Sequence, residues 1–137
     1  AYGNTAKIAE EIREGILEAK PDAECVTYDI IEHDMGELHA LVNRCNAFAV
    51  GSPTLNRDAV PPVWTLLAGI DAINSGKKPV LVFGSYGWTG EAVANIQARL
   101  MGLKMSVFED GFKVNFVPTV EDLEAARDMG RRFAQSF

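Results

Sequence analysis

AFAVGS (47–52) and PVLVFGS (79–85) are short, almost wholly apolar segments, and each of them ends in Gly-Ser. Segments without a polar face are typical of strands that are buried on both sides, as in a parallel sheet covered by helices. In such sheets, ligands bind beyond the carboxyl ends of the strands. The loops that follow the two segments are therefore the first places to look for a binding site.

Helical patterns precede and follow these segments along the whole chain. In residues 5–19, Ile8, Ile12 and Ile16 recur every four positions while charged residues fill most of the others, which is typical of an amphipathic helix. Thr119 to Asp122 resembles the capping box that begins a helix. The expected helices are 5–19, 35–44, one from Pro61 with a stripe ending at Ile70 and Ile73, 90–103, and a last one with Leu123, Ala126, Gly130, Phe133 and Phe137 on one face. The expected strands are 24–30, 47–52, 79–85 and 112–118.

This alternation of helices and strands predicts a doubly wound α/β domain, with a parallel sheet between two layers of helices. The sequence begins directly with the first helix, whereas a strand before that helix would be central in such a sheet. Without it, the strands at 24–30 and 47–52 would lie about 9.6 Å apart with their facing edges unpaired. We therefore expect the natural chain to extend upstream of Ala1 by at least one apolar strand.

Composition narrows the class of protein. The 137 residues fit a single domain, 1–137. With 13 Lys and Arg against 19 Asp and Glu, the net charge of −6 argues against nucleic acid as a partner. No apolar run approaches the ~20 residues of a membrane helix, so no membrane association is expected. Cys25 and Cys45 form no Cys-x-x-Cys pair and are expected to be reduced thiols, which favours a cytoplasmic location.

Three loops with ligand-binding character follow or precede the expected elements. The first lies at a helix N-terminus, where unpaired amides and a partial positive charge suit a phosphate. The other two follow strands and combine small residues, hydroxyl groups and flat aromatic rings. Each loop alone also fits an ordinary turn, cap or core lid, whereas the three together predict a site for flavin mononucleotide (FMN). The loops are Tyr2-Gly3-Asn4-Thr5, Gly51-Ser52-Pro53-Thr54-Leu55-Asn56-Arg57 and Gly84-Ser85-Tyr86-Gly87-Trp88-Thr89-Gly90.

The same three loops resemble the pattern of flavodoxins. More narrowly, residues 51–62 and 84–92 are similar to the flavodoxin-like domain of flavodiiron proteins, and residues 116–123 strengthen the match. The resemblance covers essentially the whole chain. It implies a five-stranded parallel sheet of strand order 2-1-3-4-5, with its first strand upstream of Ala1. Flavodoxins usually begin the phosphate loop with a Ser or Thr three residues before the Gly, and that position also precedes Ala1.

Within this frame, we assign candidate roles to the loop residues. Backbone amides near Gly3, with Asn4 and Thr5, are expected to hold the phosphate. Trp88 is expected to stack on the flavin ring, with Tyr86 or Leu55 on or beside its other face. Polar contacts at the ring edge are expected from Thr54, Asn56 and Gly87, and the remaining candidate residues of the three loops are Tyr2, Pro53, Ser85 and Gly90.

The resemblance also implies partners. In flavodiiron proteins, a domain of this kind is joined to a metallo-β-lactamase-like domain with two irons, which reduces dioxygen or nitric oxide. Rubredoxin or a related reductase is the usual electron donor, and head-to-tail homodimers bring each flavin close to the partner subunit's irons. The present chain has only two histidines, His33 and His39, without a repeated set of ligands around them. It is therefore expected to bind no metal and to act as an electron relay.

Other functions remain compatible with these residues. The chain could be a stand-alone flavodoxin or a flavin-dependent NAD(P)H or quinone reductase, which would need a substrate pocket over the ring. It could also be a flavin-free interaction module, because fold does not determine function. A phosphate-accepting receiver domain is disfavoured because the strand at 47–52 ends in Gly-Ser-Pro rather than in an aspartate.

Overall fold

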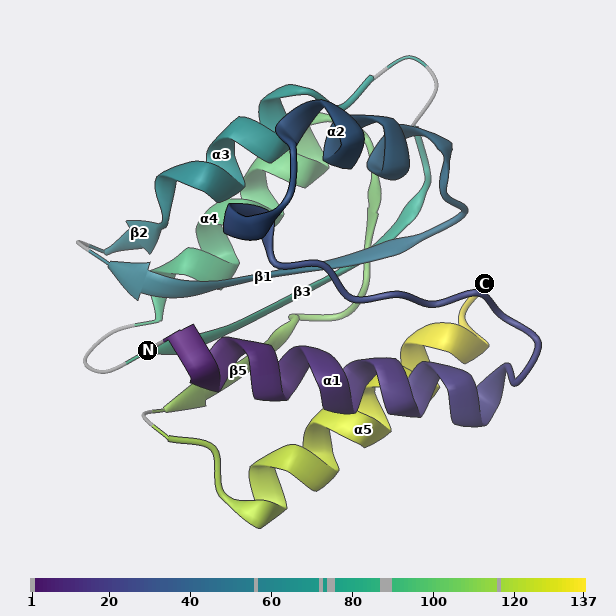
Figure 1. Cartoon of the computed structure of the whole chain (residues 1–137), viewed down its shortest axis with the longest axis vertical. Helices are drawn as coiled ribbons and strands as arrows, with labels where there is room; N and C mark the ends of the chain where they lie inside the picture. Colours follow the sequence, from purple (N-terminus) through teal and green to yellow (C-terminus); the bar gives the residue numbers. More distant parts are fainter. Residues whose placement is uncertain (1, 56, 72, 74–75, 87–89, 116) are drawn as a thin grey trace.

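The strand β3 (Pro79–Tyr86) lies at the centre of the sheet in the computed structural model of the chain (Figure 1), which describes residues 2–55, 57–71, 73, 76–86, 90–115 and 117–137. The strand β1 (Phe48–Leu55) runs parallel to β3, in register from Phe48 opposite Val80 to Pro53 opposite Ser85. All residues of β3 except the two at its ends are buried. The two strands predicted from their apolar sequences are thus confirmed.

The other side of β3 is shared by two short strands. The strand β4 (Ser106–Val107) pairs with the start of β3, and β5 (Phe112–Asn115) pairs with its second half, both in parallel. A fifth strand, β2 (Asp58–Ala59), folds back antiparallel onto the end of β1. In the part of the chain that the structure describes, the sheet therefore has five strands. Of these, β2 and β4 were not predicted, and β5 is shorter than the expected strand at 112–118.

The prediction of a strand at 24–30 is wrong. Residues 23–29 belong to no strand or helix, and a short 3₁₀ helix, η1, occupies Ile30–Glu32. The segment is held by side chains of the first helix instead: Arg13 Nε donates to the Cys25 carbonyl at 2.9 Å, and Thr27 Oγ1 donates to Glu10 Oε1 at 2.8 Å. Its β-branched and aromatic residues favour a strand only where a neighbouring strand pairs with them, and Val26 is 56% exposed.

The edge of β1 that faces away from β3 explains this outcome. Over the described residues, that edge carries a strand only at Thr54 and Leu55, where β2 pairs with it. Several residues of β1 are accordingly only half-buried, in contrast to those of β3. The segment at 24–30 therefore has no strand beside it with which to pair.

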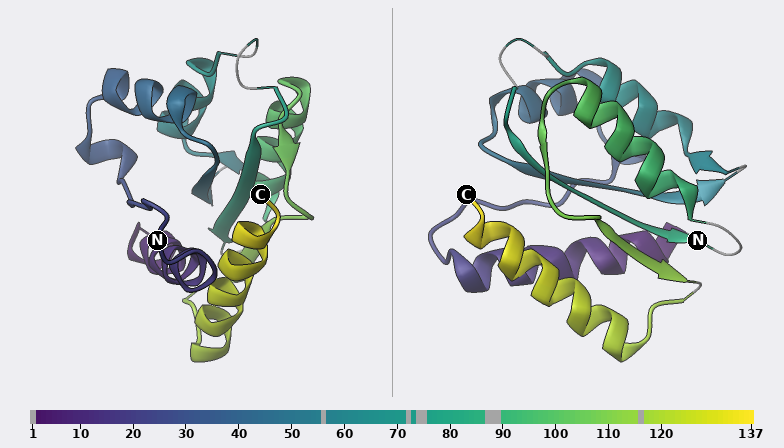
Figure 2. Two further views of the ribbon diagram at one scale, coloured as in Figure 1. Left: turned by 90° about the vertical axis from the view of Figure 1, so that its right-hand side faces the viewer. Right: turned by 180° about the vertical axis from the view of Figure 1, so that it is seen from behind.

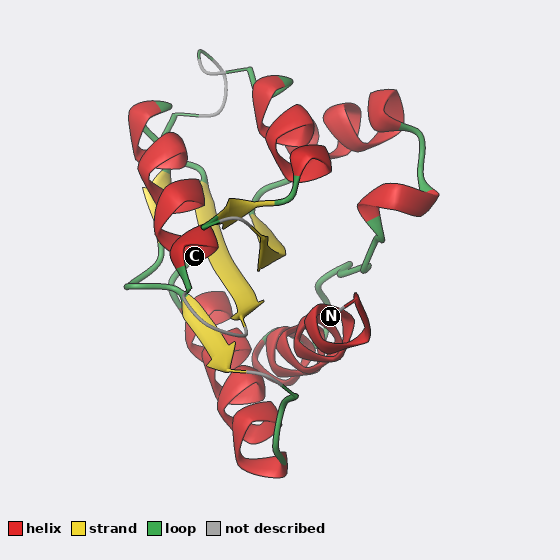
Figure 3. Cartoon of the chain, turned by 90° about the vertical axis from the view of Figure 1, so that its left-hand side faces the viewer, coloured by secondary structure: helices red, strands yellow, loops and turns green. Residues whose placement is uncertain are grey.

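The helices form two layers, one on each face of the sheet (Figures 1 and 2). The helices α1 (Tyr2–Ala19) and α5 (Val120–Gln135) cover one face, while α3 (Pro61–Ala68) and α4 (Glu91–Gly102) cover the other. The helix α2 (Met35–Arg44) packs beside α3, as Figure 3 also shows. This layered α/β architecture confirms the predicted fold class.

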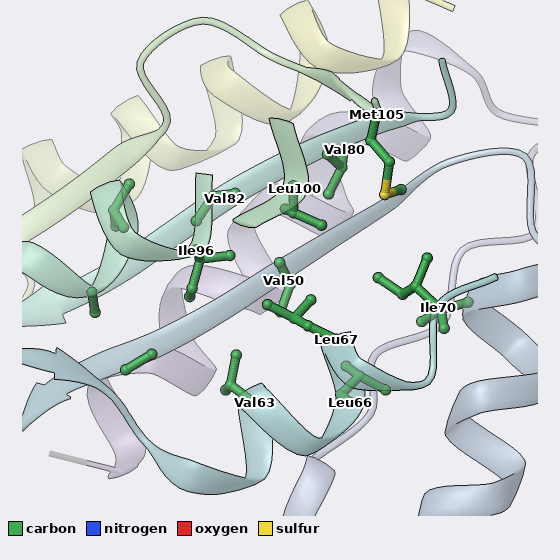
Figure 4. Packing of buried hydrophobic residues seen from close by; sticks show 14 of the residues in the cluster. Val50, Val63, Leu66, Leu67, Ile70, Val80, Val82, Ile96, Leu100 and Met105 are labelled. Carbon is green, nitrogen blue, oxygen red and sulfur yellow. The ribbon is translucent and has the colours of Figure 1, made fainter. Parts of the chain in front are cut away.

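Each face of the sheet has its own apolar core. On the α3–α4 side, residues such as Val50, Leu67, Val82 and Ile96 interdigitate between sheet and helices (Figure 4). On the opposite side, the isoleucines of α1 predicted to face inward are all buried against β3 and α5. The period-four pattern of α1 was therefore a correct guide to its packing.

The helix ends agree with the sequence in part. The capping box at α5 is present, since Thr119 Oγ1 accepts from Asp122 N at 3.1 Å and Asp122 Oδ2 accepts from Thr119 N at 2.9 Å. The expected stripe of α3 is too long, because the helix ends at Ala68 and Ile73 is 92% exposed. Phe137 lies beyond α5 and is half-exposed, packed on Phe133.

Two glycines allow α1 and α5 to approach closely. A Cβ atom on Gly15 would overlap the carbonyl oxygen of Arg127, and one on Gly130 would overlap that of Ile12. Ion pairs also join the helices, including Arg127 Nε to Glu11 Oε2 at 2.9 Å. Such partly exposed ion pairs contribute only about 0–1 kcal/mol, so the close backbone contact is the stronger constraint on this helix pair.

We expect Gly15→Ala to lower the free energy of unfolding by about 1–3 kcal/mol, because the helices would have to separate to admit the methyl group. Helix propensity alone predicts the opposite sign, a gain of up to about 1 kcal/mol. Urea unfolding measures the difference. Gly102→Ala is the matched control, since a Cβ at Gly102 would meet nothing within 4 Å; equal stability changes in the two variants would contradict this account of the packing.

Candidate functional site

The carboxyl ends of the parallel strands meet at one edge of the sheet, where α1 and α4 also begin. Thr5 in the first turns of α1 and Ser85 near the end of β3 share a hydrogen bond of 2.9 Å between their hydroxyl oxygens. Ser85 is buried and stands opposite Pro53 of β1 in the sheet register. One residue from each of the three predicted loops is thus brought to the same place.

Tyr86, at the end of β3, brings an aromatic side chain to this edge of the sheet. A Cβ on Gly90 would lie 3.2 Å from Tyr86 Cδ1 and 3.0 Å from Lys113 Cδ, so the tyrosine ring and the lysine stem flank the glycine. Gly90 is the N-cap of α4 and, as a glycine, has no side chain to cap that helix. Tyr86 and Gly90 therefore lie together at the edge, as their spacing in the sequence suggested.

One feature of the predicted loops needs correction. Residues Tyr2–Thr5 are not a loop before the first helix, because α1 already begins at Tyr2. Thr54 Oγ1 accepts from the backbone N–H of Ala92 at 3.2 Å, and its expected contact with a ligand ring stays a prediction. The candidates Asn56, Gly87 and Trp88 lie outside the described residues, so their predicted roles stay predictions.

The N-termini of α1 and α4 at this edge differ in charge. The first turn of α1 contains no acidic residue, whereas that of α4 contains Glu91. An anion is stabilised by the unpaired amides and the dipole of a helix N-terminus, and a carboxylate in the same turn opposes it. The hydroxyl of Thr5 adds a neutral donor beside α1. A phosphate group therefore fits the α1 end of the site and not the α4 end.

The structure shows a hydrogen-bonded cluster around Asp58 that was not predicted from the sequence. Its Oδ1 accepts from the backbone N–H of Ala59 at 2.8 Å and from Asn95 Nδ2 at 3.0 Å, and its Oδ2 accepts from Trp64 Nε1 at 3.1 Å. The hydrogen bond from Asn95, followed by that from the Ala59 amide, holds the pKa of Asp58 below its ordinary value. The three side chains come from β2, α3 and α4, and no spacing in the sequence joins them.

The described residues contain neither a metal-binding cluster nor a membrane-spanning helix. They contain no group of three or more His, Cys, Asp or Glu side chains arranged to hold a metal ion. No described helix is long and apolar enough to cross a membrane.

Comparison with known proteins gives consistent matches. The family model described as flavodoxin matches residues 1–130. The flavo-diiron protein FprA2 of Clostridium acetobutylicum is 46% identical over 136 residues, which are 99% of this chain and 34% of that protein. The crystal structure of the flavodiiron protein from Giardia intestinalis superposes with a TM-score of 0.90 at 29% identity, over 98% of this chain and 33% of the other.

A third match is the rubredoxin oxygen:oxidoreductase from Desulfovibrio gigas, with a TM-score of 0.89 and 25% identity over 99% of this chain and 33% of the other. The chain thus spans about a third of the length of these relatives.

The Asp58 cluster predicts a pH-dependent stability. Because the pKa of Asp58 is lowered on folding, its contribution is fully present above the unfolded value of about 3.9 and is lost as the pH falls through the folded pKa. Asp58→Asn should therefore be less stable than the wild type at pH 7, and the difference should shrink as the pH is lowered below about 4. Unfolding free energies measured from pH 3 to pH 7 test this; a constant difference would contradict it.

Proposed function

The chain belongs to the flavodoxin family, and from this premise we propose that it is the electron-transferring domain of a flavodiiron protein. In this role it relays electrons from a reduced carrier to an oxygen- or nitric-oxide-reducing di-iron site in another domain. The hydrogen bond between Thr5 and Ser85 is the observation that carries the proposal, because it joins a helix N-terminus suited to phosphate with the carboxyl end of the central strand.

FMN is the cofactor of flavodoxin domains of this kind. When bound, it accepts and releases electrons one at a time, which links one-electron carriers to multi-electron chemistry. The amides of the first turn of α1, with Asn4 and Thr5, hold the phosphate by neutral donors and the helix dipole. The negative charge of the phosphate is thus stabilised although that turn contains no lysine or arginine.

We propose that residues at the carboxyl ends of β1 and β3 contact the flavin ring. Trp88 stacks on the ring, and Tyr86 or Leu55 lies on or beside its other face, with Asn56 and Gly87 at the ring edge. The position of Tyr86 beside Gly90 supports this placement. Thr54 also supplies a polar contact at the ring edge, because its hydroxyl accepts from the Ala92 N–H and still has its proton to donate.

The proposed partners follow from the relatives. FprA2 is named as a flavo-diiron protein, and the Desulfovibrio structure is a rubredoxin oxygen:oxidoreductase. A di-iron domain in the same chain or in a dimer partner is therefore the proposed acceptor, and rubredoxin or a related reductase the proposed donor. Cys25 and Cys45 are free thiols in the structure, which is compatible with the proposed cytoplasmic location.

The proposal is tested by titrating the flavin-free protein with FMN and with riboflavin, which lacks the phosphate, and following the quenching of flavin fluorescence. We expect stoichiometric binding of FMN by the wild type. Thr5→Val should weaken FMN binding by about 1.5–3 kcal/mol, the scale of a hydrogen bond to a charged group, and leave riboflavin binding unchanged.

Thr65→Val is the matched control for this variant. Thr65 lies one turn into α3, and its hydroxyl donates to the Pro61 carbonyl at 3.3 Å, away from the proposed phosphate position. This variant should bind both flavins as the wild type does. A wild type that takes up no FMN would refute the proposed function in favour of a flavin-free module, and rapid NAD(P)H oxidation by the loaded protein would favour a reductase.

Trp88→Ala should weaken FMN and riboflavin binding alike, by about 1–3 kcal/mol, because a stacked aromatic ring contacts the flavin ring rather than the phosphate. The same fluorescence titration measures both affinities. Phe137→Ala, which removes a half-exposed ring beyond the C-terminal end of α5, is the control and should bind normally. Unchanged affinity in Trp88→Ala would exclude stacking on this residue.

A further inference from the structure

The hairpin formed by β1 and β2 is held by α4 on both of its strands. On β1, the hydroxyl of Thr54 accepts from the backbone N–H of Ala92 at 3.2 Å. On the returning side, Asn95 Nδ2 donates to the carbonyl of Arg57 at 3.1 Å and to Asp58 Oδ1 at 3.0 Å. Ala92 and Asn95 are three residues apart and so lie on the same face of the helix.

Two further contacts complete the support of the hairpin. Trp64 Nε1 of α3 donates to Asp58 Oδ2 at 3.1 Å, which leaves the two carboxylate oxygens bonded to different helices. The fully buried hydroxyl of Ser52 accepts from Val60 N at 3.0 Å and donates to the Pro53 carbonyl at 2.7 Å. The hairpin is therefore bonded to α3, to α4 and across its own base.

The backbone at the turn shows why this support matters. Arg57 has a φ of 62°, in the left-handed region that residues other than glycine adopt uncommonly. Its carbonyl is one of the two groups that Asn95 binds. The amide of Asn95 thus stabilises a backbone conformation that the sequence at this position does not favour on its own.

We propose that Asn95 is a positioning residue for the flavin, acting through the β1–β2 hairpin rather than by contact with the ring. The inference rests on the proposed function, in which the end of β1 borders the ring. Asn95 holds the Arg57 carbonyl and the Asp58 carboxylate in place. Loss of these hydrogen bonds would loosen the end of β1 beside the ring, and would thereby weaken flavin binding and change the midpoint potentials.

Asn43 provides a matched control with the same chemistry at the opposite edge of the sheet. Its Nδ2 donates to the Gly69 carbonyl at 3.0 Å, and its Oδ1 accepts from Asp71 N at 2.7 Å. It lies near the end of α2, which leads into the amino end of β1. Asn43→Ala therefore removes two comparable hydrogen bonds without touching the hairpin.

The test compares Asn95→Ala with Asn43→Ala in thermal unfolding, FMN affinity, visible circular dichroism of bound FMN and its midpoint potentials. We expect both variants to lose similar stability. Only Asn95→Ala should bind FMN about three- to tenfold more weakly, the scale of one lost hydrogen bond, with altered dichroism and shifted potentials. Trp64→Phe, which keeps the aromatic packing but removes the donor to Asp58, should show the same changes in weaker form.

The outcomes separate this inference from the proposed function. If the wild type binds FMN and Asn95→Ala matches it in affinity, dichroism and potentials, the positioning role is refuted and the proposed function stands. Equal losses of FMN affinity in Asn95→Ala and Asn43→Ala would show general destabilisation and also refute it. If Asn95→Ala does not fold, wild-type behaviour of Trp64→Phe refutes the role and its weakened binding supports it. A wild type that binds no FMN refutes both.

Discussion

The parallel pairing of β3 with its neighbours is the constraint on which the rest of the structure depends. With β1 on one side and β4 and β5 on the other, β3 is buried through its length except at its ends. Parallel pairing sends the carboxyl ends of β1, β3 and β5 to one edge, and the helices that follow or precede them begin there. Residues as distant in sequence as Thr5 and Ser85 meet at that edge for this reason.

The chemistry of that edge follows from neutral groups rather than from charges. The first turn of α1 lacks acidic residues, whereas α4 begins with Glu91, so a phosphate has one preferred end. The net charge of −6 disfavours a nucleic-acid backbone but does not oppose a single phosphate bound by amides and a hydroxyl. Membership of the flavodoxin family implies FMN, and the N-terminus of α1 has no acidic residue that would oppose its phosphate.

At the segment 24–30 and at the hairpin 54–59, the local sequence pattern did not predict the contacts that the structure shows. The first has the residues of a strand but no adjacent strand among the described residues, and it is held to α1 by hydrogen bonds of Arg13 and Thr27 instead. The second contains Thr54, whose hydroxyl accepts a hydrogen bond from the backbone of α4, a contact that the sequence did not predict. In both cases the outcome depended on which groups were neighbours in space, and that information is not carried by residue type.

The sequence by itself determined the fold class, the two buried parallel strands, the inward face of α1 and the capping box of α5, because apolar periodicity and capping act over a few residues. Only the tertiary structure decided that Asp58, Trp64 and Asn95 form one cluster and that Gly15 and Gly130 are close-contact positions. Asn95 is far from Asp58 in the chain, as α1 is from α5. These partners are therefore chosen by the packing of helices on the sheet rather than by neighbouring residues.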